Sequence, residues 1–145
     1  GNFDAMFETA PSLKLKFNEK PVLFGEIADG TGEVLTELYH SRWLKRIETD
    51  DDFGMITERT EGKKKCFSDK IIRRNTIPPT MTSGSYMVDY DTGLHISDSV
   101  KKLIRTFPQD YDFAGNPAQY IIGMSVPPLM MARFVDSVYS QWMEV

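Results

Sequence analysis

Prolines near the C-terminal end constrain the folding of this chain more than any other feature. Residues 107–113 contain Pro108, which predicts that a preceding helix stops here, because proline lacks a backbone N–H and clashes with the previous turn. Two more prolines close the stretch 125–128. Proline is tolerated in the first turn of a helix, so Ser125 is predicted to cap a helix that begins at Val126. A helix start of this kind has free N–H groups that could hold an anion.

Length and composition limit the class of protein. The 145 residues are enough for one domain, or for one domain and part of another. No uninterrupted apolar run approaches the roughly 20 residues of a membrane span, and no leader-like segment opens the chain, so we expect no membrane partner. The single cysteine, Cys66, cannot form an internal disulfide, which favours a reducing cytoplasm.

Local patterns predict an α+β fold, a small mixed domain with short strands or hairpins and about three helices. Alternation predicts a strand over residues 13–17, and apolar spacing predicts helices over 36–47, 98–107 and 126–142, the second capped by Ser97. The remaining expectations are a strand over 70–74, a hairpin over 85–96, a turn at 29–32 and an apolar strand or turn over 120–123. The acidic run 50–52 is expected to be a solvated loop or a helix cap, since it lacks the pattern of a calcium loop.

Residues 59–74 form a basic segment in a chain whose formal charge is −4. The segment contains seven basic residues and two acidic ones, Glu61 and Asp69, so its formal charge is +5. The basic side chains are Arg59, Lys63, Lys64, Lys65, Lys70, Arg73 and Arg74. A mobile, lysine-rich loop around Gly62 and a phosphate-binding surface are both compatible with this pattern.

The last predicted helix is apolar over most of its surface. Its polar residues are few, and the rest of the chain is short and rich in loops. A face this wide needs a large partner surface, so we expect that something outside this chain normally covers it.

Four stretches in one order carry a resemblance to a known family. They are Pro79-Thr80-Met81-Thr82, Ile96-Ser97, Phe-Pro-Gln-Asp-Tyr-Asp-Phe at 107–113 and Tyr-Ile-Ile-Gly-Met-Ser-Val-Pro-Pro at 120–128. The chain from about residue 71 onward resembles the C-terminal part of the DNA (cytosine-5) methyltransferases. In that family a Pro-Thr-[Ile/Leu]-Thr segment is the ninth conserved block and Ile-Gly-Asn-[Ser/Ala]-Val-Pro-Pro is the tenth.

The resemblance implies a two-domain enzyme that transfers a methyl group from S-adenosylmethionine to C5 of a cytosine flipped out of double-stranded DNA. Residues 1–118 would form the small target-recognition domain, and 119–145 would be the C-terminal helix that packs on an α/β catalytic domain missing from this chain. The cofactor would lie beside Met124, Ser125 and Val126. The residues expected at the DNA are Arg59, Arg73 and Arg74 on guanine edges or phosphates, Lys63, Lys64 and Lys65 on phosphates, and Thr80 and Thr82 near the backbone.

The departures from the family pattern bear on catalysis. The nucleophilic cysteine should follow a proline, but Cys66 follows Lys65, and no Glu-Asn-Val block occurs. We therefore expect no methyl transfer by this chain alone. Met124 stands where the family has Asn, which removes a side-chain hydrogen bond beside the cofactor, so we expect the isolated chain not to hold S-adenosylmethionine.

Two other readings remain open. The chain could be a stand-alone DNA-binding or protein-interaction module. An independent small enzyme is disfavoured, because no acid–base dyad, nucleophile elbow or metal-ligand cluster is evident and the two histidines, His40 and His95, are far apart in sequence. If the chain is part of a methyltransferase, its partners are double-stranded DNA, the missing catalytic domain and, for the isolated chain, a second copy bound through the C-terminal helix. The expected setting is DNA methylation of the restriction–modification type in a prokaryotic or phage-infected cytoplasm.

Overall fold

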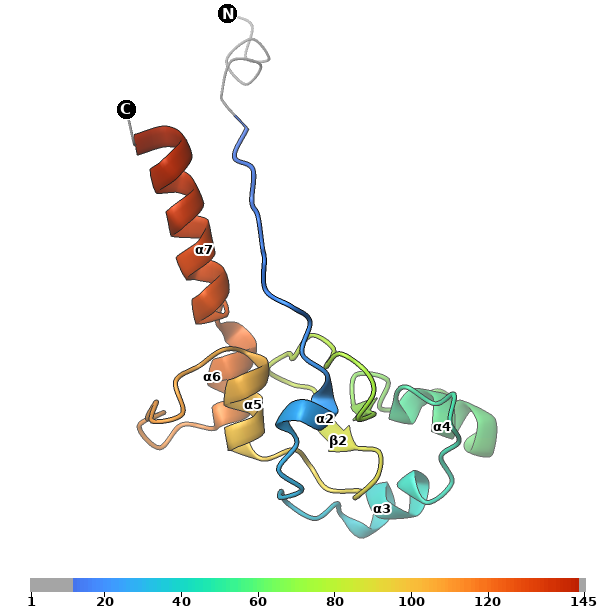
Figure 1. The fold of residues 1–145 in the computed structure, drawn as a ribbon. Helices are drawn as coiled ribbons and strands as arrows, with labels where there is room; N and C mark the ends of the chain where they lie inside the picture. Colours follow the sequence, from blue (N-terminus) through green and yellow to red (C-terminus); the bar gives the residue numbers. More distant parts are fainter. Residues whose placement is uncertain (1–11, 144–145) are drawn as a thin grey trace, which may run out of the picture. The chain divides into compact units, whose positions relative to one another are not determined.

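The computed structural model describes residues 12–143, which fall into two compact units (Figure 1). The larger unit holds residues 20–127. The smaller unit holds the two ends of the chain, of which residues 12–19 and 128–143 are described. The division predicted from the sequence, after residue 118, falls after the first residue of helix α6 (Ala118–Met124), which belongs to the larger unit.

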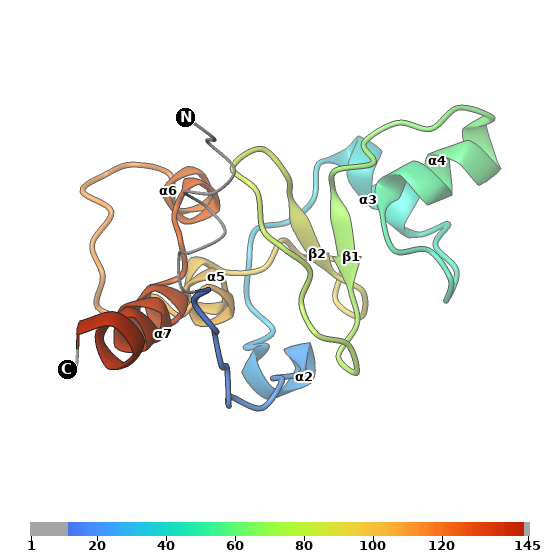
Figure 2. The ribbon, with the colours of Figure 1, turned by 90° about the horizontal axis from the view of Figure 1, so that it is seen from above.

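A two-stranded parallel sheet lies at the centre of the larger unit. Strand β1 (Lys70–Ile72) pairs with β2 (Met87–Asp89), and Ile71 is opposite Val88. Figures 1 and 2 show α3 (Glu37–Trp43) and α4 (Phe53–Glu61) on one side of the sheet and α5 (Asp98–Ile104) and α6 (Ala118–Met124) on the other. The short helix α2 (Phe24–Ile27) completes the unit. The α+β class expected from the sequence is confirmed.

Each face of the sheet has its own hydrophobic core, because successive strand side chains point to opposite faces. Ile71 and Val88 face α3 and α4, where they join Leu35, Trp43, Phe53 and Ile56. Ile72 and Met87 face α5 and α6, where they join Phe24, Met81, Ile96, Val100, Phe107, Ala118 and Ile122. The sheet is thus a thin wall between two helical layers.

The hairpin expected at residues 85–96 is present in a shortened form. After β2 the chain turns at Gly93, whose φ is +66°, and returns through a bridge between Val88 and His95. The Ile96 N–H donates to the Met87 carbonyl at 3.0 Å. The return segment delivers Ser97 to the start of α5.

Side-chain caps begin three of the helices. Thr36, Asp52 and Ser97 each accept a hydrogen bond from a backbone N–H in the first turn of α3, α4 and α5. The predicted start of the first helix and the Ser97 cap are therefore confirmed, but α3 ends at Trp43 and α5 at Ile104. In the acidic run, Asp52 is the predicted cap, whereas Asp50 is buried.

Helices α2, α4 and α6 were not predicted. Residues 59–61 of α4 were expected to be loop, and its core face is short, with Phe53 and Ile56 as the large apolar residues. Gly62, with φ +70°, ends it. α6 replaces the strand or turn predicted at 120–123, because Ala118 and Ile122 lie one turn apart and both enter the core. A four-residue apolar run does not distinguish these outcomes.

The prediction that Ser125 caps the last helix is wrong. Ser125 follows the end of α6, where its hydroxyl donates to the Ile121 carbonyl at 2.6 Å and its N–H donates to Ile122. The next helix, α7, begins at Pro128 and runs to Val138. Pro127 therefore lies between the two helices, whereas Pro128 is the first residue of α7, so the prediction of proline in the first helical turn holds for Pro128 alone.

The smaller unit consists of α7, a π-helical continuation η1 (Tyr139–Met143) and an extended segment, residues 12–19. The Gln141 side chain bonds both backbone groups of Lys14, at 3.0 and 2.8 Å, and Arg133 pairs with Glu19 at 2.5 Å. Residues 13–17 pair with no described strand, so the strand predicted there is wrong; the Gln141 amide takes the place of a neighbouring strand.

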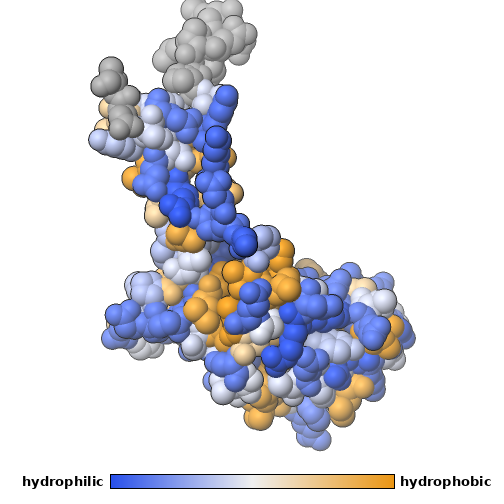
Figure 3. All heavy atoms as spheres, in the orientation of Figure 1, coloured by the Kyte–Doolittle hydropathy of each residue, from blue (hydrophilic) through white to orange (hydrophobic). Residues whose placement is uncertain are grey.

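Helix α7 buries none of its eleven residues. Its large apolar side chains are exposed except that of Val138, and Figure 3 shows some of them in orange. By length and composition alone, Ala118–Met143 meets the criterion for a membrane-spanning helix. Core helices of soluble proteins meet the same criterion, and the stretch contains Arg133 and Asp136.

Candidate nucleic-acid interface

The basic segment is ordered by α4 and β1 and is largely neutralised by carboxylates. Five of its seven cations form ion pairs with described residues. The pairs are Arg59–Asp50, Lys65–Glu61, Lys70–Asp52, Arg73–Asp51 and Arg74 with Asp89 and Asp91. Of the loop predicted over residues 59–65, residues 62–65 are outside any helix or strand, whereas residues 59–61 belong to α4.

The acidic run brings Arg59 and Arg73 to one place. The Arg59 guanidinium donates to Asp50 Oδ2 at 2.5 Å, and Arg73 donates to the Asp50 carbonyl at 2.6 Å and to Asp51 at 2.7 Å. Asp50 is only 2% exposed. Arg59 consequently supports the fold, and a DNA contact by Arg59 would have to be made alongside this pair or at its expense.

Lys63 and Lys64 follow the Gly62 cap and form no ion pair with any residue between 12 and 143. Both are exposed. The neighbouring Glu61 is held by Arg42 and Lys65, which lower the pKa of its carboxyl to about 2. Lys63 and Lys64 are thus the predicted phosphate ligands whose charge is available to a partner.

Arg46 and Tyr90 belong to the same surface but were missed by sequence reasoning. The Arg46 guanidinium stacks 3.6 Å from the centre of the Trp43 ring and 4.5 Å from that of Tyr90, and Arg73 lies 5.1 Å from Tyr90. Within residues 12–143, Arg46 pairs with no carboxylate; its one hydrogen bond goes to the Trp43 carbonyl. A guanidinium stacked on aromatic rings keeps its charge and its remaining N–H donors.

A hollow of about 430 Å³ lies beside this stack. Arg73, Arg74, Asn75 and Tyr90 line it together with Glu48 and Asp91. Aromatic and guanidinium groups side by side suit a nucleic-acid backbone and its bases. The two carboxylates limit how much negative charge the hollow can accept.

Thr80 and Thr82 lie on the extended connection between the strands. Thr80 is exposed, and the Thr82 hydroxyl donates to Ser85 Oγ at 2.7 Å. The Thr82 carbonyl accepts a 2.5 Å hydrogen bond from the Gln119 side chain of α6. Met81, between the two threonines, is 1% exposed and anchors the segment in the core.

The predicted cofactor residues lie at the end of α6. Met124 is 67% exposed, and Val126 is also exposed. The carbonyl of Ser125 accepts a hydrogen bond from Arg105 at 2.7 Å, and its N–H is used within α6. A cofactor contact here would therefore come from side chains and from Val126, not from a free helix start at Ser125.

No metal-ligand cluster is present within the described part of the chain. Comparison with known proteins gives no assignment: no family model matches, and neither the curated proteins nor the solved structures contain a significant match.

Proposed function

We propose that this chain is the DNA-recognition and C-terminal part of a cytosine-5 DNA methyltransferase. The observation that carries the proposal is that the four stretches of the family resemblance meet in one core. Met81, Ile96, Phe107 and Ile122, one from each stretch, belong to the same buried cluster. Chance similarity of short motifs does not require their residues to pack together.

Direct contact between the ninth-block and tenth-block stretches adds to this support. Within the tenth-block stretch, Gly123 lies against the backbone of Thr82 and Ser83, and Gln119, the residue before that stretch, bonds the Thr82 carbonyl. A methyltransferase of this type must hold its DNA-reading domain against its cofactor domain. A rigid junction between these two stretches would serve that purpose.

The chemistry proposed for the whole enzyme needs groups that this chain does not supply. In the whole enzyme a cysteine thiolate would add to the ring of the flipped cytosine, S-adenosylmethionine would supply the methyl group for C5, and a base would take the C5 proton as the thiolate leaves. Cys66 does not match the family's nucleophile, because it follows Lys65 and not a proline. This chain would contribute DNA contacts and one wall of the cofactor site.

The exposed face of α7 fits the same proposal. Leu129, Phe134 and Val135 are each at least 38% exposed, and Trp142 is 48% exposed. We propose that the catalytic domain of the parent protein covers this face. Alone in solution, the chain would cover it by forming a dimer.

A DNA-binding titration of the purified chain tests the proposal against its alternatives. Fluorescence anisotropy with a labelled duplex should detect binding that weakens as salt rises. The Lys63→Ala/Lys64→Ala double variant should bind more weakly. Glu58→Gln, at an exposed position of α4, is the control, because it changes the charge without removing a cation. Absence of binding by both the chain and its full-length parent would instead favour a protein-interaction module.

A further inference from the structure

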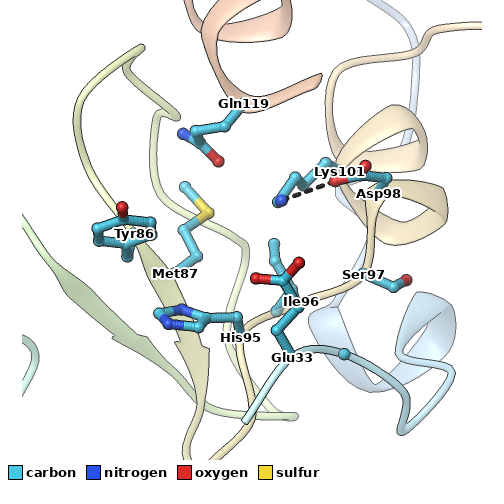
Figure 4. Close-up of a pocket in the computed structure, with 10 residues that line it drawn as sticks. Glu33, Tyr86, Met87, His95, Ile96, Ser97, Asp98, Lys101 and Gln119 are labelled. Atoms are coloured by element: carbon cyan, nitrogen blue, oxygen red, sulfur yellow. Dashed lines mark hydrogen bonds and ion pairs between the residues drawn. The ribbon is translucent and has the colours of Figure 1, made fainter. Parts of the chain in front are cut away.

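A polar groove in the larger unit is separate from the basic surface and from the predicted cofactor residues. Its deeper part is a cavity of about 260 Å³, and a second hollow of about 340 Å³ shares five lining residues with it. The groove continues over Ser83–Ser85 to Tyr120. Figure 4 shows Gln119, Lys101 and Glu33 around the opening, with Tyr86 and Met87 on the side away from Lys101.

Hydrogen bonds hold the loop 29–33 in place and position Glu33 at the edge of the groove. Asp29 accepts hydrogen bonds from Thr31 and from the Ser97 hydroxyl, the latter at 2.6 Å. Although burial opposes it, these bonds keep the pKa of Asp29 below its usual value. Gly32 then passes so close to the His95 carbonyl that no Cβ fits, and the Glu33 carbonyl accepts the His95 N–H at 2.9 Å.

Glu33 provides a carboxylate with no partner among the described residues. Across the opening, Lys101 on α5 pairs with Asp98 at 2.8 Å and retains two further N–H donors. The side-chain NH₂ of Gln119 on α6 donates a hydrogen bond to the Thr82 carbonyl, and the side-chain oxygen of Gln119 remains available as an acceptor. The groove therefore presents acceptors and a cation at separate positions.

An aromatic wall accompanies these polar groups. Tyr86 is 52% exposed, and its ring packs 4.9 Å from that of His95. Burial lowers the pKa of His95, so the ring beneath Tyr86 is neutral near pH 7. Met87 and Ile96 form the apolar floor. This combination suits a flat ligand with a polar edge.

We propose that this groove binds a guanine base that is not paired in a duplex. Guanine carries two adjacent kinds of N–H donor, at N1 and N2, which suit the Glu33 carboxylate, and a carbonyl acceptor at O6, which suits Lys101. Cytosine and adenine do not offer two neighbouring donors beside a carbonyl. Tyr86 provides a ring for stacking.

The choice of a nucleobase among flat ligands rests on the proposed function. The groove would add a base contact outside the basic surface. Thr82, a predicted DNA-backbone contact, is bonded to Gln119 at the groove.

Free nucleotides test the groove without a duplex or a catalytic domain. Guanosine monophosphate added to ¹⁵N-labelled chain should cause saturable shifts at Glu33, Tyr86, Lys101 and the Gln119 side chain. Inosine monophosphate, which lacks the 2-amino group, should bind about tenfold more weakly, because the carboxylate then loses a donor. Cytidine monophosphate should bind no more tightly than inosine monophosphate.

The Glu33→Gln variant preserves the shape of the side chain and should bind guanosine and inosine monophosphate equally. The control Glu58→Gln, at an exposed position of α4, should behave as wild type. Equal affinity of the wild type for the two nucleotides, or shifts confined to other residues, would overturn the inference. Such a result would leave methyl transfer by the parent protein unaffected. Conversely, a parent protein without methyltransferase activity would leave guanine binding by this chain intact.

Discussion

Gly123 of α6 lies directly on the backbone of Ser83, forty residues earlier in the chain. A Cβ at position 123 would come within 2.5 Å of Ser83 Cα and closer still to its nitrogen, so only glycine fits. The contact joins the extended connection between β1 and β2 to the helix that precedes the proline break. These are two of the stretches on which the methyltransferase resemblance rests.

Replacing Gly123 with Ala should destabilise the larger unit. The added methyl group would push α6 off the Ser83 backbone, and overpacking of this kind costs about 1–3 kcal/mol, more than alanine gains in helix propensity. Gly84→Ala is the matched control, because nothing lies within 4 Å of a Cβ there and its φ is not in the left-handed region. Urea unfolding should separate the two variants; equal stabilities would show that α6 does not pack as described.

Arg59 and the lysines after Gly62 should respond differently to substitution. Arg59→Ala removes the ion pair of buried Asp50 and should lower the free energy of unfolding by about 1–2 kcal/mol. Lys63→Ala and Lys64→Ala should each change stability by less than about 0.5 kcal/mol. On DNA, the lysine variants should reduce the salt slope of binding by roughly 0.9 for each lost phosphate contact. An Arg59→Ala variant as stable as wild type would contradict its structural role.

The Glu61 carboxyl should link stability to pH. Its pKa is about 2 in the folded chain against an ordinary value of 4.5, with hydrogen bonds from Arg42 and Lys65 as the main causes. A lowered carboxyl pKa stabilises the fold above about pH 4.5, and this contribution is lost as the pH falls towards 2. The stability difference between wild type and Glu61→Gln should therefore shrink over this range. A difference independent of pH would mean that the ion pair with Arg42 does not form.

Met124 offers a test of the proposed cofactor wall. Because its side chain is 67% exposed, Met124→Asn should leave the unfolding free energy of this chain unchanged within about 0.5 kcal/mol. In the full-length parent, the restored amide should tighten binding of S-adenosylmethionine, measured by calorimetry. Unchanged affinity in the Asn variant would place the cofactor away from Met124.

Local signals in the sequence were sufficient for part of the fold. The helix start near Thr36, the cap at Ser97, the turn at 29–32, the strand at 70–72 and the α+β class could be predicted, because each depends on a few neighbouring residues. α4 and α6 could not. Their helical character comes from packing on the sheet, through Phe53 and Ile56 in one case and Ala118 and Ile122 in the other.

The candidate interface shows the same limit. Sequence counting found the basic segment, but the carboxylates that neutralise it come from other segments, such as Asp50–Asp51 and Asp89. Arg46 and Tyr90 were missed because they become neighbours of Arg73 only through the fold. The Glu33–Lys101–Gln119 groove likewise draws on three separate segments, and no spacing in the sequence points to it.

Methyl transfer by the protein encoded by the full reading frame that contains this chain tests the central claim most directly. With S-adenosylmethionine labelled in its methyl group and double-stranded DNA, the account predicts label in 5-methylcytosine after nucleoside digestion, and loss of that product when the upstream Pro-Cys cysteine is replaced with Ser. Label confined to N6-methyladenine or N4-methylcytosine, or no incorporation by a folded, DNA-binding protein, would contradict it.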